Sequence, residues 1–192
     1  MKINLRRVTT GAVLIAAASA FLFCTGFTKA SDHGNHENGY LKSATYYSDD
    51  WVINFWNSES SHMDEELKQI REDGFNSIIL VVPWREFQPS MAPEHYNDYA
   101  WEKFDRVMKA AKAQDLKVML RVEYTWDYYS SENVLARYEK LLYDSETKKA
   151  WLHYAKRLYE KASAYDNFSG GFITWEDFWN FAENGSTLYG SG

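Results

Sequence analysis

Acidic and tryptophan side chains recur together after short apolar runs of this sequence. Trp56 closes the first run, Trp84 follows the second, Glu123 and Trp126 follow the third, and Glu176 follows the fourth. Further polar or aromatic candidates at these positions are Arg85, Arg121, Trp179 and Asn180. Indole faces stack on the apolar C–H faces of pyranose rings, and amides, guanidinium groups and carboxylates bind hydroxyls. Cleavage of a glycosidic bond also requires two carboxyl groups.

Glu176 is the strongest candidate for acid chemistry. It stands in the stretch GGFITWEDFWNF, residues 170–181, between Trp175 and Trp179. Neighbouring aromatic rings desolvate an ionised carboxylate, which favours retention of its proton near neutral pH. A glutamate in this setting could therefore act as a general acid, and a solvated loop residue is the alternative that the residues alone leave open. Asp177 is better explained as a solvated loop residue, and Glu123 as a solvated residue or an ion-pair partner of Arg121.

Alternating strands and helices must position these side chains. Strands are predicted at residues 51–56, 76–83, 117–124 and 172–175, and helices at residues 61–73, 99–114, 132–143 and 146–165. Buried strands joined by amphipathic helices indicate right-handed βαβ units and a parallel sheet. The sheet could be open and doubly wound, or part of an eight-stranded barrel of roughly 250 residues. No G-x-G-x-x-G motif follows the first predicted strand, which argues against a dinucleotide site.

The N-terminus carries the pattern of an export signal. Lys2, Arg6 and Arg7 precede an apolar segment at residues 11–24, and the small residues Thr28 and Ala30 occupy positions −3 and −1 of a cleavage site before Ser31. We predict a signal peptide at residues 1–30, a flexible polar leader at residues 31–45 and a single domain at residues 46–192. The protein should be secreted or at the cell surface. An uncleaved N-terminal anchor is the alternative, and it would be the only contact with a membrane.

Charge and composition narrow the possible partners. Removal of residues 1–30 changes the formal net charge from −6 to −10, because this segment has four cations and no acid. Such an acidic chain is not expected to bind nucleic acid. No metal site or cofactor is predicted. Aromatic residues make up 17% of the chain, with 8 Trp and 14 Tyr, so they form either a bulky core or stacking surfaces for a ligand.

One segment resembles a known enzyme family. Residues 74–90, GFNSIILVVPWREFQPS, resemble the second βα unit of clan A glycoside hydrolases, and the G-F-N-x-I…V-x-W-x-x-F-Q-P layout is similar to family 5. The likeness continues through residues 99–120. It implies a (β/α)8 TIM barrel, of which this chain holds about the first four βα units, and a retaining mechanism on an extracellular polysaccharide, with β-glucan favoured. It also places the acid/base at Glu176, with Glu183 as the alternative.

The sequence departs from the family pattern at three points. Trp175 stands where the family has Asn before the acid, and Ile79 and Leu80 stand where the family has an arginine in the second strand, for which Arg85 or Arg121 could substitute in space. No residue here matches the nucleophile that follows the seventh strand. We therefore expect the chain to be part of a longer hydrolase or a half that pairs with another half, and to be inactive alone. The alternatives are a non-catalytic carbohydrate-binding protein with a Trp-rich rim, and a surface interaction domain whose aromatic residues only fill its core.

Overall fold

A computed structural model describes residues 40–123, 128–129, 132 and 134–173. Four strands form one sheet: β1 (Ser43–Tyr46), β2 (Ser77–Val82), β5 (Lys117–Val122) and β6 (Phe168–Ile173). The other elements are a short antiparallel pair, β3 (Ser90–Met91) and β4 (Glu94–His95), and the helices η1 (Asn54–Asn57), α2 (Met63–Glu72), α3 (Trp84–Phe87), α4 (Asp98–Ala113), α5 (Val134–Tyr143) and α6 (Ser145–Ala162).

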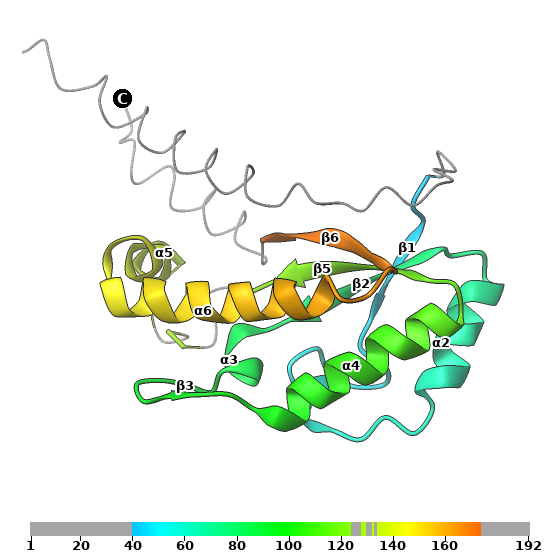
Figure 1. Ribbon diagram of the computed structural model, residues 1–192, viewed down its shortest axis with the longest axis horizontal. Helices are drawn as coiled ribbons and strands as arrows, with labels where there is room; N and C mark the ends of the chain where they lie inside the picture. Colours follow the sequence, from blue (N-terminus) through cyan, green and yellow to red (C-terminus); the bar gives the residue numbers. More distant parts are fainter. Residues whose placement is uncertain (1–39, 124–127, 130–131, 133, 174–192) are drawn as a thin grey trace, which may run out of the picture. The chain divides into compact units, whose positions relative to one another are not determined.

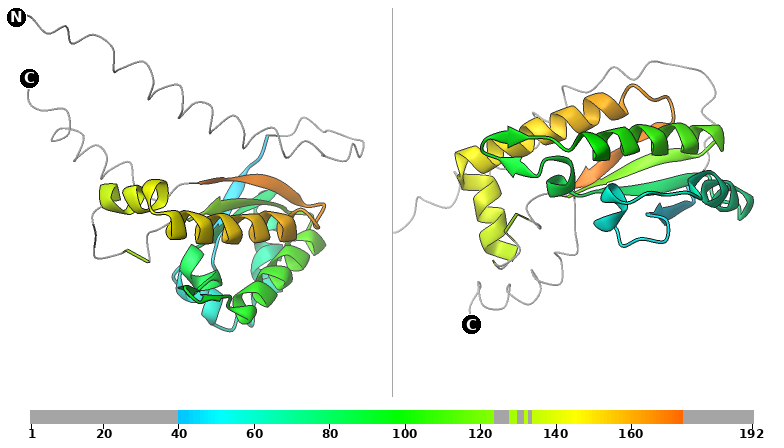
Figure 2. Two further views of the ribbon diagram at one scale, coloured as in Figure 1. Left: turned by 60° about the vertical axis from the view of Figure 1, so that its left-hand side comes forward. Right: turned by 90° about the horizontal axis from the view of Figure 1, so that it is seen from below.

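The sheet is parallel throughout, with the strand order β1-β2-β5-β6. Helices α2, α4 and α6 all lie on one side of it, as Figures 1 and 2 show. A doubly wound sheet would carry helices on both faces, whereas a barrel keeps them outside. The described part of the chain therefore has the arrangement of a partial TIM barrel, as the resemblance implied.

The helix-covered face of the sheet forms the core. Leu80, Leu120 and Val122 are completely buried, and the register pairs Leu80 with Leu120 across β2 and β5. The opposite face carries Ile79 and Met119, which are also paired and are only half-buried. This difference between the faces matches a helix layer on one side only.

The predicted helices are confirmed, and polar caps set the starts of the two longest. Asn97 precedes α4, and its side chain accepts a hydrogen bond from the backbone N–H of Ala100. Asp144 precedes α6 in the same way, accepting from Thr147 N at 2.8 Å. This hydrogen bond, the largest cause, lowers the pKa of the Asp144 carboxyl. Each cap satisfies a backbone donor that has no partner within its helix.

The prediction of a first strand at residues 51–56 is wrong. This stretch contains the 3₁₀ helix η1, and the first strand is β1, which includes residues 43–45 of the expected leader. Val52, Phe55 and Trp56 are buried, a spacing of three and four residues that a helical turn produces and an alternating strand does not. The aromatic content of the run concealed this helical period.

The last strand begins earlier than predicted, because β6 starts at Phe168. Its glycines permit close packing: a Cβ on Gly171 would lie 2.7 Å from the carbonyl oxygen of Leu120 and 2.7 Å from the hydroxyl of Tyr159. Gly170 has a φ of 107°, which disfavours other residues.

No helix in the described part of the chain is long and apolar enough to cross a membrane. The expected signal peptide, residues 1–30, lies outside the described residues.

Candidate functional site

The carboxyl ends of the parallel strands meet at one edge of the sheet, and Glu123 follows β5 directly at this edge. Its Oε2 accepts a hydrogen bond of 2.9 Å from the backbone N–H of Trp84, which follows β2. Its own N–H donates to the carbonyl of Val82 at 3.2 Å. Glu123 is completely buried. The solvated position expected for Glu123 is therefore wrong, and the residue ties the end of β5 to that of β2. Its contact with a substrate stays a prediction.

Two aromatic residues of α6 support the same strand ends. Trp151 donates from Nε1 to the carbonyl of Glu123 at 3.3 Å, and the Tyr154 hydroxyl donates to the carbonyl of Val82 at 2.7 Å. Burial, and then the nearby charge of Glu123, raises the pKa of the Tyr154 hydroxyl well above its usual value. Tyr154 therefore stays a neutral donor, and the carbonyl of a β2 residue keeps its partner.

Trp56 and Trp84 are core residues, so their predicted role as sugar-stacking surfaces is wrong. Both are 0% exposed. The Trp56 ring packs 4.5 Å from that of Phe87, and its Nε1 donates to Val81 O at 2.9 Å. The Trp84 ring lies 4.5 Å from that of Tyr128. Tryptophan has the largest apolar surface of any side chain, and here burial removes both rings from any ligand.

A chain of hydrogen bonds leads from Trp84 towards the surface. Trp84 Nε1 donates to Oε1 of the buried Gln88 at 2.6 Å, and Gln88 Nε2 donates to Glu94 Oε1 at 2.9 Å. The other Glu94 oxygen lies 3.3 Å from His153 Nδ1 on α6. The Tyr96 hydroxyl and, to a smaller extent, His153 lower the pKa of the Glu94 carboxyl. These hydrogen bonds fix the β3–β4 hairpin against α6 and hold the Trp84 ring in one orientation.

The remaining predicted site residues divide into two groups. Arg85 is exposed on α3, and Arg121 is half-buried near the end of β5, in register with Val81 and Phe172. Both lie near the carboxyl edge of the sheet, and their contact with substrate remains a prediction. The other predicted residues lie outside the described part of the chain: Trp126, Glu176, Trp179, Asn180 and the reserve acid Glu183.

Sequence analysis overlooked an exposed aromatic side chain that follows β1. Trp51, in the segment between β1 and η1, is 61% exposed. Its ring contacts that of Tyr47 in an edge-on arrangement, with centroids 6.4 Å apart. The signal was the spacing of Trp51, Asn54 and Asn57, which are all exposed and recur at the period of a 3₁₀ helix.

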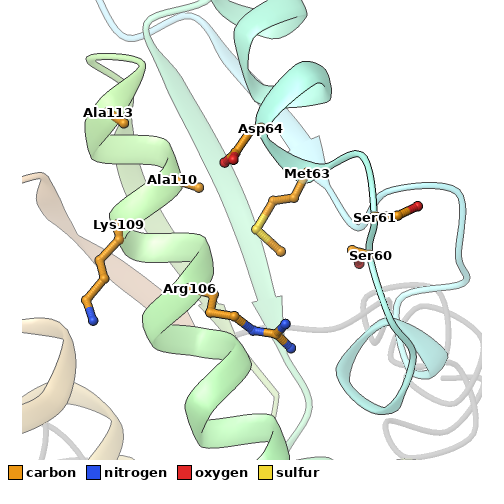
Figure 3. Close-up of a pocket in the computed structure, with 8 residues that line it drawn as sticks. All are labelled: Ser60, Ser61, Met63, Asp64, Arg106, Lys109, Ala110 and Ala113. Atoms are coloured by element: carbon orange, nitrogen blue, oxygen red, sulfur yellow. The ribbon is translucent and has the colours of Figure 1, made fainter.

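Two shallow surface hollows lie elsewhere. An open depression of about 460 Å³ separates the start of α2 from α4, with Met63 and Ala110 among its lining residues (Figure 3). Asp64 points across it towards α4, and Arg106 reaches towards Ser60. A second open hollow, of about 430 Å³, lies beside Tyr47 and α2. The first hollow belongs to the helix layer, away from Glu123 and Trp84. Within the described residues, no three acidic, histidine or cysteine side chains cluster as metal ligands would.

Comparison with known proteins identifies the fold of the chain but does not identify its activity. No protein-family model and no curated protein matches the sequence. A solved structure of GH5_18 from Bifidobacterium longum subsp. longum, in complex with Manβ1-4GlcNAc, is similar to the chain with a TM-score of 0.56 and 18% identity, over 70% of this chain and 33% of that one. GH5_18 from Streptomyces cattleya, in complex with GlcNAc, gives a TM-score of 0.55, 18% identity and coverage of 69% and 33%.

These similarities confirm the predicted TIM-barrel fold and the structural likeness to clan A glycoside hydrolases. The chain spans about a third of the length of the structures it matches. At 18% identity the likeness establishes the fold alone, because one barrel architecture supports many chemistries.

Proposed function

We propose that this chain supplies the first four βα units of a secreted glycoside hydrolase that acts on a polysaccharide, with β-glucan favoured. The observation that carries the proposal is the one-sided parallel β1-β2-β5-β6 sheet, which matches glycoside hydrolase barrels over 70% of the chain. The matched structure from Bifidobacterium holds a β-1,4-linked disaccharide. Export through residues 1–30 would bring the protein to such a substrate.

In this proposal the reaction follows the retaining course. Glu176 protonates the leaving oxygen and then activates water, while a second carboxylate attacks the sugar and forms a covalent intermediate. No residue of the sequence matches that nucleophile, so a polypeptide segment outside these 192 residues would supply it. Arg85 and Arg121, at the carboxyl edge of the sheet, would bind sugar hydroxyls.

The described residues would contribute rigidity to that site. Glu123 joins the ends of β2 and β5, and Trp151 and Tyr154 of α6 donate hydrogen bonds to backbone carbonyls at these ends. Catalysis depends on groups held in position before the reaction begins. The buried hydrogen bonds around Glu123 would therefore hold the strand ends on which the catalytic and binding residues stand.

The first test measures binding and hydrolysis by the purified 192-residue protein on a panel of β-glucan, mannan and chitin oligosaccharides. We expect binding without release of reducing sugar. Release of reducing sugar would contradict the assignment of the nucleophile to a segment outside the chain. Failure to bind any member of the panel would contradict the proposed function itself.

The second test addresses Glu176. If the reading frame continues past the codon for Gly192, Glu176→Gln in the extended protein should lower kcat by at least about a hundredfold and spare binding, because general acid catalysis contributes roughly 10²–10⁴ in rate. Glu183→Gln is the matched control and should retain most activity. The reverse result would assign the acid to Glu183.

A non-catalytic carbohydrate-binding protein is the second candidate. The exposed Trp51 favours it, because a stacking surface requires no carboxylate pair. Polysaccharide binding without release of reducing sugar by the extended protein, and unchanged binding after Glu176→Gln, would favour this alternative.

A further inference from the structure

Helix α6 carries an exposed basic face on a chain that is acidic as a whole. Its 18 residues include five cations and two acids, whereas the full chain has a formal net charge of −6. Lys149, His153 and Arg157 recur at every fourth position and are all exposed, so they lie along one side of the helix. Lys156 adds an exposed cation next to Arg157. These four residues are called the basic face below.

Barrel units beyond this chain would not cover the basic face. The face adjoins the β3–β4 hairpin, which lies beside α6 (Figure 2), because His153 Nδ1 lies 3.3 Å from Glu94 Oε2 and Arg157 packs on Tyr96. The hairpin belongs to the unit between β2 and β5, which precedes α6 in the barrel order. A unit that follows β6 would adjoin the other side of α6, since the helices of a TIM barrel surround the strands in sequence order. The basic face therefore stays on the outer surface of a complete barrel.

The guanidinium group of Arg157 is positioned by two aromatic rings and has no ion pair among the described residues. Its Cζ lies 4.3 Å from the centre of the Tyr96 ring and 4.9 Å from that of Trp101. These contacts are made over the ring faces and use none of the N–H donors of the group, which remain for an anion. A carboxylate can accept two of these donors at once, and little side-chain entropy is lost because the rings already hold the group.

Lys149 and His153 extend the basic face towards the start of α6. Positions four residues apart are separated by about 6 Å along the axis, because each residue of an α-helix advances it by about 1.5 Å. The Tyr96 hydroxyl, then His153 and last the charge of Lys149 lower the pKa of the Glu94 carboxyl, which places all three near it. The cations thus follow a line, which suits an extended polymer better than a compact anion.

The carboxylate of Glu94 at this face narrows the class of anionic ligand. Its side chain is 35% exposed, so a ligand can reach it, and Oε2 lies beside His153. A carboxylate oxygen can accept two hydrogen bonds, so Oε2 can accept a second one from a ligand. A surface made of phosphate groups would be repelled by this charge, whereas a sugar hydroxyl would donate to it. The mixture of cations and one acceptor suits a polymer that carries both carboxylates and hydroxyl groups.

We propose that the basic face, together with Glu94, binds a polysaccharide that carries carboxylate groups, such as a polyuronate. Arg157 binds one carboxylate through its paired N–H donors, Lys149 and Lys156 attract the neighbouring carboxylates, and Glu94 accepts a hydrogen bond from a sugar hydroxyl. The site lies on the outer surface of the helix layer and not inside the barrel, so it anchors the protein on an acidic polymer. This binding goes beyond the proposed function and does not require hydrolysis.

The test measures the affinity of the purified 192-residue protein for polygalacturonate at increasing ionic strength. The wild-type protein should bind at about 50 mM salt and dissociate at about 500 mM, because salt screens exposed charges. Lys149→Gln/Arg157→Gln should weaken binding by about fivefold or more, as expected for the loss of two exposed charge contacts. Lys68→Gln/Lys109→Gln is the matched control, because it removes the same charge from exposed positions on α2 and α4.

Each other outcome contradicts the proposal. Failure of the wild-type protein to bind polygalacturonate would overturn it, as would an equal loss of affinity in the control variant. Undiminished binding at high salt, or binding to phosphatidylglycerol vesicles that is as tight, would also contradict it. If the Arg157 change disturbs folding, because the ring contacts are lost, Lys149→Gln/Lys156→Gln removes two exposed charges of the same face and decides. The neutral panel of β-glucan, mannan and chitin tests the proposed function separately, so either proposal can fail alone.

Discussion

The buried amine of Lys103 gives the sharpest physical prediction. Its side chain is 0% exposed, and Nζ lies 3.9 Å from the centre of the Phe55 ring. Burial lowers the pKa of this amine to about 8, although the charges of Asp50, Glu59 and Glu66 act in the opposite direction. A lysine with so low a pKa in the folded state makes stability depend on pH.

The direction in which the free energy of unfolding changes with pH follows from the number of protons that each state binds. In the unfolded chain the lysine has a pKa near 10.5, so between about pH 8 and pH 10.5 the unfolded state binds more protons than the folded state. The free energy of unfolding therefore rises with pH in this window, by up to about 2 kcal/mol between pH 7 and pH 9.5. Tyrosines with raised pKa values, such as Tyr165 at about 12, act in the opposite direction but only near pH 10 and above.

Urea denaturation of the wild-type protein and Lys103→Met at several pH values between 7 and 9.5 tests this reasoning. The wild type should exceed the variant by a margin that grows with pH. At pH 7 the variant should already be less stable, by about 1–3 kcal/mol, because the carbonyls of Phe55 and Ser58 lose their donor. The control is Lys109→Met, an exposed lysine of the same helix, which should follow the wild type. A constant margin between wild type and Lys103→Met would refute the argument.

Two further substitutions test buried contacts. Gln88→Met should lower the free energy of unfolding by about 1–3 kcal/mol, because it leaves the buried Nε1–H of Trp84 without its acceptor; urea denaturation would measure this, and a neutral result would contradict the hydrogen bond. Gly171→Ala should cost about 1–3 kcal/mol by overpacking against the Leu120 carbonyl, whereas Ser169→Ala, exposed on the same strand, should be nearly neutral in thermal unfolding.

The spacing of apolar residues predicted the main elements, because their buried positions follow the pattern typical of each element. The apolar positions of α4 and α6, and the continuous apolar run of β2, gave their elements close to the observed bounds. β1 was missed because Ser-Ala-Thr-Tyr is a four-residue edge strand with little apolar character. Pairing with β2, rather than its own pattern, makes it a strand.

The candidate site was harder to predict than the fold, because nearness to a strand end does not determine which way a side chain points. Trp56 and Trp84 both stand at such ends, yet they turn into the core, while Trp51 turns outward. Identity and position alone could not distinguish them. The helical spacing of residues 51–57 could have done so, since it places Trp51 opposite the buried Phe55 and Trp56.

The residues on the two faces of β5 explain why none of the described helices covers one face of the sheet. Val118, Leu120 and Val122 are buried under the helices, while Met119 and Arg121 alternate with them on the other face and are half-buried. A doubly wound sheet needs apolar residues on both faces, because helices cover both. A guanidinium beside Val81 and Phe172 instead suits a barrel interior near its carboxyl mouth, where polar side chains can reach a ligand. Arg121 thus argues for the barrel closure from within the strand itself, independently of any likeness to solved structures.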